Sequence, residues 1–380
     1  MNREIREQYR SAISKAKRIV VKIGTSSLTY PTGKLNLSRL EGLVREVADI
    51  QNEGREMILV SSGAVGAGLG RLGFKRRPSK IPEKQAAAAV GQGILMHIYE
   101  KLFSEYGQVV AQVLLTRFDL LERRCYLNAR NALMTLLNLG VIPIVNENDT
   151  IIVEGLHFGD NDTLSALVAG LVEADLLLIL SDIDGLYTAD PREHPEAVLL
   201  PVIEEITQEV EQLAGGTGSQ WASGGMATKL QAARIATSSG LPMVIANSQE
   251  ERIIRRILAG ESIGTLFLSK EHKLDARQRW IAFGSTVRGS VVVDAGAREA
   301  ILQRGKSLLP SGITAIEGVF EAGQVVQVKG PNGQEIARGM VNYSSGAVER
   351  IRGKKTSEIE AVLGYKDFDE VIHRNNMILV

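Results

Sequence analysis

The stretch "DNDTLSALVAGLVEADLLLILS" (residues 160–181) places a helix-like segment directly before a strand-like one. Apolar residues recur at helical spacing over 160–172, and 174–181 is a short, almost wholly apolar run. A strand without polar alternation needs apolar cover on both faces, which helices on two sides of a parallel sheet provide. The stretch therefore predicts a buried strand of an α/β sheet, with a helix leading into it.

The same alternation recurs on both sides of this stretch. Strand-like runs lie at 18–23, 56–61, 108–115, 141–145, 174–181 and 242–246, and helical patterns lie at 36–53, 84–105, 119–138 and 160–172. This order predicts an αβα sandwich built on a mainly parallel sheet.

The pattern changes near residue 275 to strand, turn, strand. The run "GVFEAGQVVQVKGPNGQEIARGMVNYSS" (residues 318–345) contains "PNG", which is typical of a hairpin turn. A small, mostly β domain is therefore expected at the C-terminal end. A length of 380 residues suits two such domains.

Composition excludes several classes of protein. The chain has 44 Lys plus Arg and 44 Asp plus Glu, so no overall charge would attract it to nucleic acid or a membrane. Cys125 is its one cysteine, which rules out an intramolecular disulfide. The start "MNREIREQYR" lacks the apolar core of a signal peptide, and the run "LLLIL" at 176–180 is much too short to span a bilayer. We expect a cytoplasmic protein.

Small and polar residues follow the predicted strands. "KIGTSS" begins at Lys22, and "SSGAVGAG", "NENDT", "GDNDTLSA" and "SDIDGLYTADPR" lie at or near the other strand ends. The carboxyl ends of parallel strands meet at one edge of the sheet, where ligands bind. Glycines, hydroxyls, amides and a lysine at that edge favour an anion site.

The segment "ASGGMATKLQAA" (residues 222–233) adds two glycines before a helix start and Lys229 in the first turn. Backbone N–H groups at such a start bind phosphate, and Lys22 and Lys229 would neutralise phosphoryl oxygens during transfer. We expect both lysines near a solvent-filled cleft. The alternative is that Gly224 and Gly225 merely end a loop and that Lys229 is a solvated helix lysine.

Other well-known motifs do not fit. A dinucleotide fingerprint can be matched at Gly68, Gly70 and Gly73, but it begins several residues after the strand end. "GKS" at 305–307 lacks the first glycine of a P-loop, because position 300 is Ala300. The five histidines have no metal-ligand spacing, and Cys125 is better explained as a packed helix thiol than as a nucleophile.

The motifs together, in this order, resemble the glutamate 5-kinases of the amino acid kinase family. The segments "VVKIGTSSL", "LVSSGAVGAG", "NENDT", "GDNDTLSALVA", "SDIDGLYTADPR" and "SGGMATKLQAA" carry the resemblance, which covers essentially the whole chain. The C-terminal region is similar to a PUA domain. The expected division is an N-terminal extension at 1–17, an amino acid kinase domain at 18–270, a linker at 271–285, a PUA domain at 286–368 and a tail at 369–380.

The resemblance implies transfer of phosphate from ATP to the γ-carboxylate of L-glutamate, the first step of proline biosynthesis. It also implies Mg²⁺ carried on the nucleotide, inhibition by proline and a homo-oligomer. Lys22 and Lys229 would contact the phosphates, and Asp162 would hold both lysines. Glutamate would be bound by Ser62, Gly63, Asp149 and Asn161, and the nucleotide by Lys22, Ser181, Asp182 and the loop Ser223, Gly224, Gly225, Met226, Ala227, Thr228 and Lys229.

Several alternatives stay open. Asp162 could instead be a helix N-cap, although Asp160 can fill that role. Asp184 stands where some members of the family have a neutral or basic residue, which affects the adenine contacts. Rival functions are a sister kinase for aspartate, acetylglutamate or carbamate, a nicotinamide dehydrogenase, and an RNA-binding protein acting through the C-terminal domain. The only basic patch noted for RNA there is Arg350, Arg352, Lys354 and Lys355, followed by Glu358 and Glu360.

Overall fold

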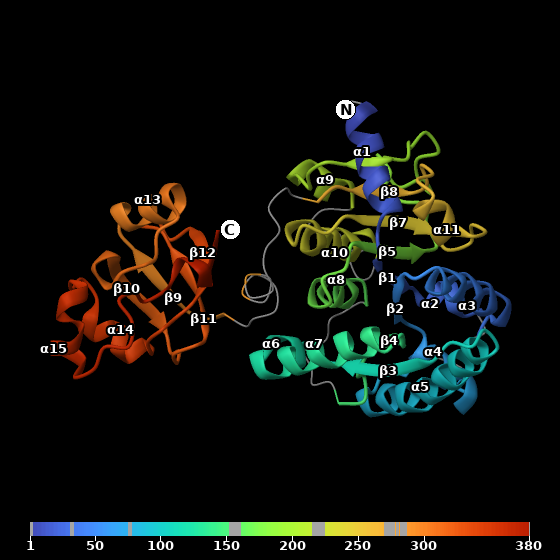
Figure 1. Cartoon of the computed structure of the whole chain (residues 1–380), viewed down its shortest axis with the longest axis horizontal. Coiled ribbons are helices and arrows are strands. Elements are labelled where there is room, and N and C mark those ends of the chain that lie inside the picture. The colour runs from blue at the N-terminus through green and yellow to red at the C-terminus, as the bar shows by residue number, and fades with distance from the viewer. Residues whose placement is uncertain are drawn as a thin grey trace. The chain divides into compact units, whose positions relative to one another are not determined.

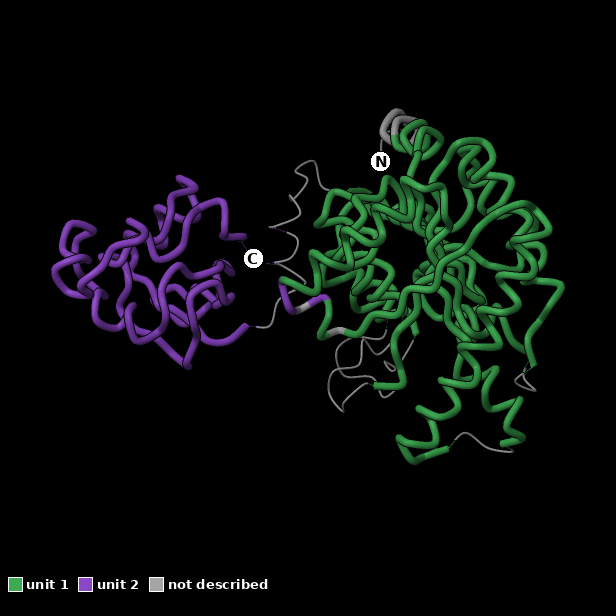
Figure 2. Tube along the Cα trace, turned by 60° about the horizontal axis from the view of Figure 1, so that its bottom comes forward, with its two compact units in different colours: residues 1–119, 124–273 green, residues 120–123, 274–380 purple. Residues whose placement is uncertain are grey.

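The computed structural model describes residues 3–30, 34–74, 78–151, 161–214, 225–269, 278, 281 and 287–379. The chain divides into two compact units, residues 1–119 with 124–273, and residues 120–123 with 274–380 (Figure 2). Most of the expected linker at 271–285 lies outside the described residues. Each unit has a hydrophobic core of its own.

The first unit is built on a sheet in the order β3-β4-β2-β1-β5-β7-β8-β6 (Figure 1). Its strands are parallel except for β8, which runs antiparallel to β7, and β6, which pairs with β8 alone in parallel. The strands are β1 (Arg18–Ile23), β2 (Glu56–Ser61), β3 (Val110–Leu115), β4 (Ile142–Glu147), β5 (Leu176–Ser181), β6 (Val202–Ile203), β7 (Met243–Asn247) and β8 (Thr265–Phe267).

Helices cover both faces of this sheet. One face packs against α1, α3, α5 and α11 in a single apolar core, and α8 and α10 lie on the other face. The helices of this unit are α1 (Arg3–Ser14), α2 (Thr25–Leu28), α3 (Leu37–Asn52), α4 (Ala64–Leu72), α5 (Ile81–Ser104), α6 (Arg117–Leu121), α7 (Arg123–Asn138), α8 (Asn161–Leu171), α9 (Gln208–Leu213), α10 (Met226–Ser238) and α11 (Ile253–Leu258). The αβα sandwich predicted from the sequence is confirmed.

The predicted elements differ from the observed ones in detail. Every predicted strand is present, but the single helix expected over 119–138 is two helices, α6 and α7. The two helices are separated at Glu122. At the start of the short α6, the backbone N–H and the hydroxyl of Thr116 both donate to the carboxylate of Asp119. The short strands β6 and β8 were not predicted, because runs of two and three residues carry no periodicity.

Helices α4 and α5 approach backbone to backbone through two glycines. A Cβ atom on Gly68 would lie 1.8 Å from the carbonyl oxygen of Ala87, and one on Gly91 would lie 1.7 Å from that of Ala64. Real Cβ atoms are never that close to an oxygen, so only glycine allows this contact. Gly68 thus serves helix packing, and its place inside α4 agrees with the rejection of a dinucleotide fingerprint.

Gly91→Ala is therefore expected to destabilise the protein by about 1–3 kcal/mol, the usual cost of forcing extra atoms into a packed contact. Gly93→Ala on the same helix is the matched control, since a Cβ there meets nothing within 4 Å. In a helix that change should stabilise by about 0.5–1 kcal/mol. Urea unfolding of both variants checks the pair, and equal effects would contradict the close contact.

The second unit is a five-stranded sheet in the order β10-β9-β11-β12-β13 with helices around it. The "PNG" turn joins β11 and β12 as an antiparallel hairpin, as predicted. Residues 369–380, expected as a tail, supply β13 and the buried Val371 and Ile372. The elements are β9 (Val287–Val293), α13 (Ala295–Arg304), β10 (Ile313–Gly318), β11 (Val325–Lys329), β12 (Glu335–Met340), α14 (Ser345–Ile351), α15 (Ile359–Leu363) and β13 (Met377–Leu379).

Candidate active site

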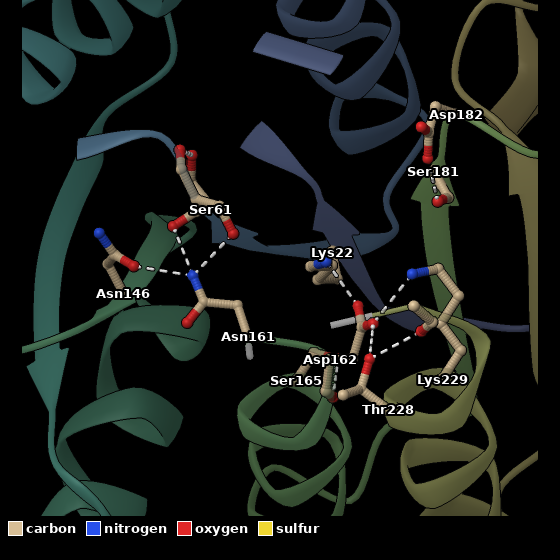
Figure 3. Close-up of polar contacts among 12 residues, drawn as sticks. Lys22, Ser61, Asn146, Asn161, Asp162, Ser165, Ser181, Asp182, Thr228 and Lys229 are labelled. Carbon is tan, nitrogen blue, oxygen red and sulfur yellow. Dashed lines mark hydrogen bonds and ion pairs between the residues drawn. The ribbon is translucent and has the colours of Figure 1, made fainter. Parts of the chain in front are cut away.

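Alternation along β1 directs Lys22 toward α8. Ile19, Val21 and Ile23 belong to the apolar core on the face of α3 and α5, so the side chain of Lys22 points to the opposite face. There its Nζ lies 2.5 Å from Oδ1 of Asp162, in the first turn of α8. Oδ2 of the same carboxylate lies 3.2 Å from Nζ of Lys229, in the first turn of α10 (Figure 3). Three elements thus bring two ammonium groups to one carboxylate.

This cluster is buried. Lys22 is 4% exposed, Lys229 is 6% exposed and Asp162 is fully buried. The alternative of Lys229 as a solvated helix lysine is therefore wrong, and the solvent-filled cleft expected near the two lysines stays a prediction. Burial alone would raise the pKa of Asp162, but the charges of Lys22 and Lys229 outweigh it and hold that pKa below its ordinary value. The carboxylate is therefore ionised throughout the physiological range.

Asp162 is not the N-cap of α8. The helix begins at Asn161, so Asp162 lies inside the first turn with its carboxylate directed at the two lysines. The hydroxyl of Thr228 lies 3.2 Å from Oδ2 of Asp162 and 2.9 Å from the carbonyl oxygen of Gly225. Asp160, the alternative cap, is outside the described residues.

Helix α10 begins at a glycine that offers no side-chain cap. Gly225 is its N-cap, followed by Met226 and Ala227, and a glycine at the N-cap has no side chain that could accept from the first N–H groups. Those N–H groups and the helix dipole favour an anion at this end. Ser223 and Gly224, which the sequence places in the same loop, lie outside the described residues.

Ser62, Gly63 and Asn161 come together beside this cluster. Nδ2 of Asn161 lies 2.9 Å from the hydroxyl of Ser62 and 3.1 Å from the carbonyl oxygen of Ser61 (Figure 3). Gly63 is the N-cap of α4, with φ of +99°, and has no side-chain cap either. The left-handed backbone explains the glycine at this position.

Two side chains that the sequence analysis did not single out are hydrogen-bonded in series to Asn161. Oδ1 of Asn146, at the end of β4, lies 2.8 Å from Nδ2 of Asn161, and Nδ2 of Asn146 lies 2.8 Å from Oε1 of Gln92 on α5. Asn146 is the first residue of "NENDT", so its place after a strand was a usable signal. Gln92 sits inside a helix and gave no signal. Asp149 is half-buried in the turn after β4.

Ser181 and Asp182 lie at the end of β5, on the other side of the lysines (Figure 3). The hydroxyl of Ser181 donates to Asp182 at 3.0 Å, and Asp182 is exposed. Asp184 accepts hydrogen bonds from Asn247 and from the hydroxyl of Tyr187, each at 2.8 Å. Asp184 therefore ties the loop after β5 to the end of β7.

The other motifs noted in the sequence lie outside this cluster of lysines and amides. Gly305 ends α13 in the left-handed conformation, so "GKS" does not precede a helix as a P-loop must. Cys125 is half-buried on α7. Of the basic patch on the second unit, Arg352 is paired with Glu349 at 2.9 Å. In the described part of the chain, no helix is both long and apolar enough to cross a membrane.

Comparison with known proteins gives matches for both units. The model of the amino acid kinase family matches residues 17–247, and that of the PUA domain matches residues 289–363. A glutamate 5-kinase of Moorella thermoacetica is 59% identical over 373 residues, covering 98% of this chain and 99% of that protein. A glutamate 5-kinase of Carboxydothermus hydrogenoformans is 55% identical over 372 residues, covering 98% of this chain and all of that protein.

A solved structure, the carbamate kinase from Giardia lamblia bound to AMP-PNP, has a TM-score of 0.51 at 18% identity. The match covers 68% of this chain and 100% of that one. At this identity the likeness shows a shared fold alone.

Proposed function

The chain belongs to the amino acid kinase family, among its glutamate 5-kinases, and we propose that phosphate transfer takes place at Lys22, Asp162 and Lys229. The protein phosphorylates the γ-carboxylate of L-glutamate with ATP, giving L-glutamyl 5-phosphate and ADP in the first step of proline biosynthesis. The observation that carries the site is the convergence of two buried lysines on one buried carboxylate.

The chemistry needs charge neutralisation more than proton transfer. A glutamate carboxylate, with a pKa near 4.3, is already ionised at neutral pH and needs no general base. One of its oxygens attacks the γ-phosphorus, the bond from that phosphorus to the β–γ bridging oxygen breaks, and ADP leaves with the electron pair. Lys22 and Lys229 would neutralise the phosphoryl oxygens, and Asp162 would hold their Nζ atoms in place beforehand.

The two ends of the site would hold the two substrates. At one end Ser181, Asp182 and the segment from Ser223 to Lys229 would bind the nucleotide, the N–H groups at the glycine-capped start of α10 facing phosphate. Mg²⁺ would arrive on the nucleotide, because it keeps water and phosphate oxygens as ligands and needs only one or two carboxylates. The exposed carboxylate of Asp182 is of the type that this ligand set accepts. At the other end Ser62, Gly63, Asp149 and Asn161 would bind glutamate.

The test of this function is ATP turnover with a panel of carboxylate acceptors. The panel contains glutamate, aspartate, N-acetylglutamate and carbamate, so it distinguishes a glutamate kinase from its sister kinases. Hydroxylamine traps the acyl phosphate product. Only glutamate should give rapid turnover. Rapid turnover of N-acetylglutamate, which has no ammonium group, would contradict the assignment of glutamate.

Asp149→Asn and Asn161→Ala are each expected to raise the KM for glutamate at least tenfold and to leave that for ATP nearly unchanged. In either variant a polar group of the bound glutamate loses its hydrogen-bond partner. Leaving a buried polar group without a partner costs about 1–3 kcal/mol, and more when the group is charged. Steady-state kinetics with either substrate varied checks this, with Asn138→Ala, exposed at the end of α7, as control. A change confined to the KM for ATP would move both residues to the nucleotide end.

Proline inhibition, a homo-oligomer and RNA binding stay predictions. Turnover with and without added proline, the mass in solution, and the salt dependence of RNA affinity test them in turn.

A further inference from the structure

Three side-chain amides form a continuous series behind the glutamate end of the site. Gln92 on α5 accepts from Asn146 at 2.8 Å, and Asn146 accepts from Asn161 at 2.8 Å. All three side chains are at most 9% exposed. The series thus links the middle of α5 to Asn161, which we propose binds glutamate.

Two backbone groups fix which way each amide points. The N–H of Glu147 donates to Asn146 at 2.9 Å, so the atom facing it must be the oxygen Oδ1. The carbonyl of Ser61 can only accept, so the atom of Asn161 that lies 3.1 Å from it must be Nδ2. Nδ2 of Asn146 is then left for Gln92, which must present its oxygen. The orientations follow from the backbone and not from a choice between similar amide atoms.

The amide nitrogen of Asn161 is taken up by protein acceptors, whereas its amide oxygen has no protein donor within the described ranges. Its Nδ2 has only two N–H bonds and already faces three oxygens, those of Ser61, Ser62 and Asn146. Its Oδ1 receives no hydrogen bond in the described part of the chain and turns away from those three oxygens (Figure 3). A substrate group bound by Asn161 would therefore meet an acceptor, and of the polar groups of glutamate only the ammonium is a donor.

A glutamine at position 92 is unfavourable for stability but supplies the acceptor that Asn146 needs. Its Nε2 is buried without a hydrogen-bond partner among the described residues, whereas an apolar side chain would avoid that penalty. Its neighbour Gly91 fixes α5 against α4 through the close contact with Ala64. Gln92 is thus held rigidly beside Asn146.

We propose that Gln92 is a positioning residue. It holds Asn146, and through it Asn161, so that Oδ1 of Asn161 faces the α-ammonium of glutamate, and it thereby sets the preference for an amino acid over a plain dicarboxylate. This inference rests on the proposed role of Asn161 in binding glutamate. Without the acceptor on Gln92, Nδ2 of Asn146 is buried without a partner, so Asn146 shifts to satisfy it and no longer holds Asn161 in place.

The experiment compares kcat/KM for glutamate with kcat/KM for glutarate, which differs by the missing ammonium. Gln92→Met keeps the length of the side chain and removes the acceptor, so it should lower the glutamate-to-glutarate ratio about tenfold, the effect of one hydrogen bond. Gln92→Glu keeps an oxygen toward Asn146 and should retain the ratio. General damage to the fold would lower both rates together and leave the ratio unchanged.

Tyr99→Phe is the matched control on the same helix. It removes the buried hydrogen bond between the hydroxyls of Tyr99 and Ser61, which lie 2.9 Å apart. It should lower the Tm and leave the glutamate-to-glutarate ratio unchanged. A folded Gln92→Met with an unchanged ratio overturns the proposal, and so does a loss of the ratio in Gln92→Glu. If Gln92→Met does not fold, Gln92→Glu alone decides. An unchanged ratio in Asn161→Ala would instead remove the assignment of Asn161 itself.

Discussion

Lys229→Met is expected to lower kcat by about two orders of magnitude or more, the usual loss when one preorganised charge donor is removed from a buried site. Lys22→Met should have an effect of the same order, because both ammonium groups are held by the same carboxylate. Methionine keeps the length and the apolar stem of lysine, so the packing around the site changes little. Turnover at saturating ATP and glutamate measures the effect.

The control for these variants is Lys101→Met, an exposed lysine in the last turn of α5, which should keep normal turnover. Both site lysines are buried, so the fold of each variant is checked by circular dichroism before its rate is interpreted. Normal kcat in a folded Lys22 or Lys229 variant would exclude that lysine from the transfer step.

Asp162→Asn is expected to lower both activity and stability. The change leaves two buried ammonium groups without their shared carboxylate, and removing one partner of a buried ion pair costs about 3–5 kcal/mol. The lysines also lose the group that fixes them, so kcat should fall at least as far as in the lysine variants. Urea unfolding at neutral pH and the turnover rate measure the two effects, and a loss of activity at unchanged stability would contradict the burial of the cluster.

The contribution of the Asp162 carboxylate to the free energy of unfolding depends on pH. The pKa of Asp162 is lower in the folded protein than its ordinary value of 3.8. The stability that its charge contributes is fully present above that ordinary value and is lost as the pH falls through the lower, folded value. The free energy of unfolding of the natural protein minus that of Asp162→Asn should be constant between about pH 8 and pH 5 and should narrow below about pH 4.

The sequence predicted best what depends on local pattern. The apolar runs predicted β1, β2, β3, β4, β5 and β7 of the first unit, and polar residues at strand ends or helix starts, such as Lys22 and Asn161, do meet at one edge of the sheet. The contacts that orient them could not be predicted in this way. Gln92 and Asn146 are 54 residues apart on different elements, and one glutamine inside a helix has nothing to distinguish it. The burial of Lys229 was also missed, since it depends on how α10 packs against α8.

The alternation along β1 limits how the length of this chain can change during evolution. In "RIVVKI" (residues 18–23), Ile19, Val21 and Ile23 belong to the apolar core, and Lys22 alternates with them. One residue inserted or deleted within this strand would turn Lys22 from α8 into the apolar layer against α3 and α5, because successive side chains point to opposite faces. We therefore expect changes in chain length to be tolerated in the loops, which have no strand register, and not between the start of β1 and Lys22.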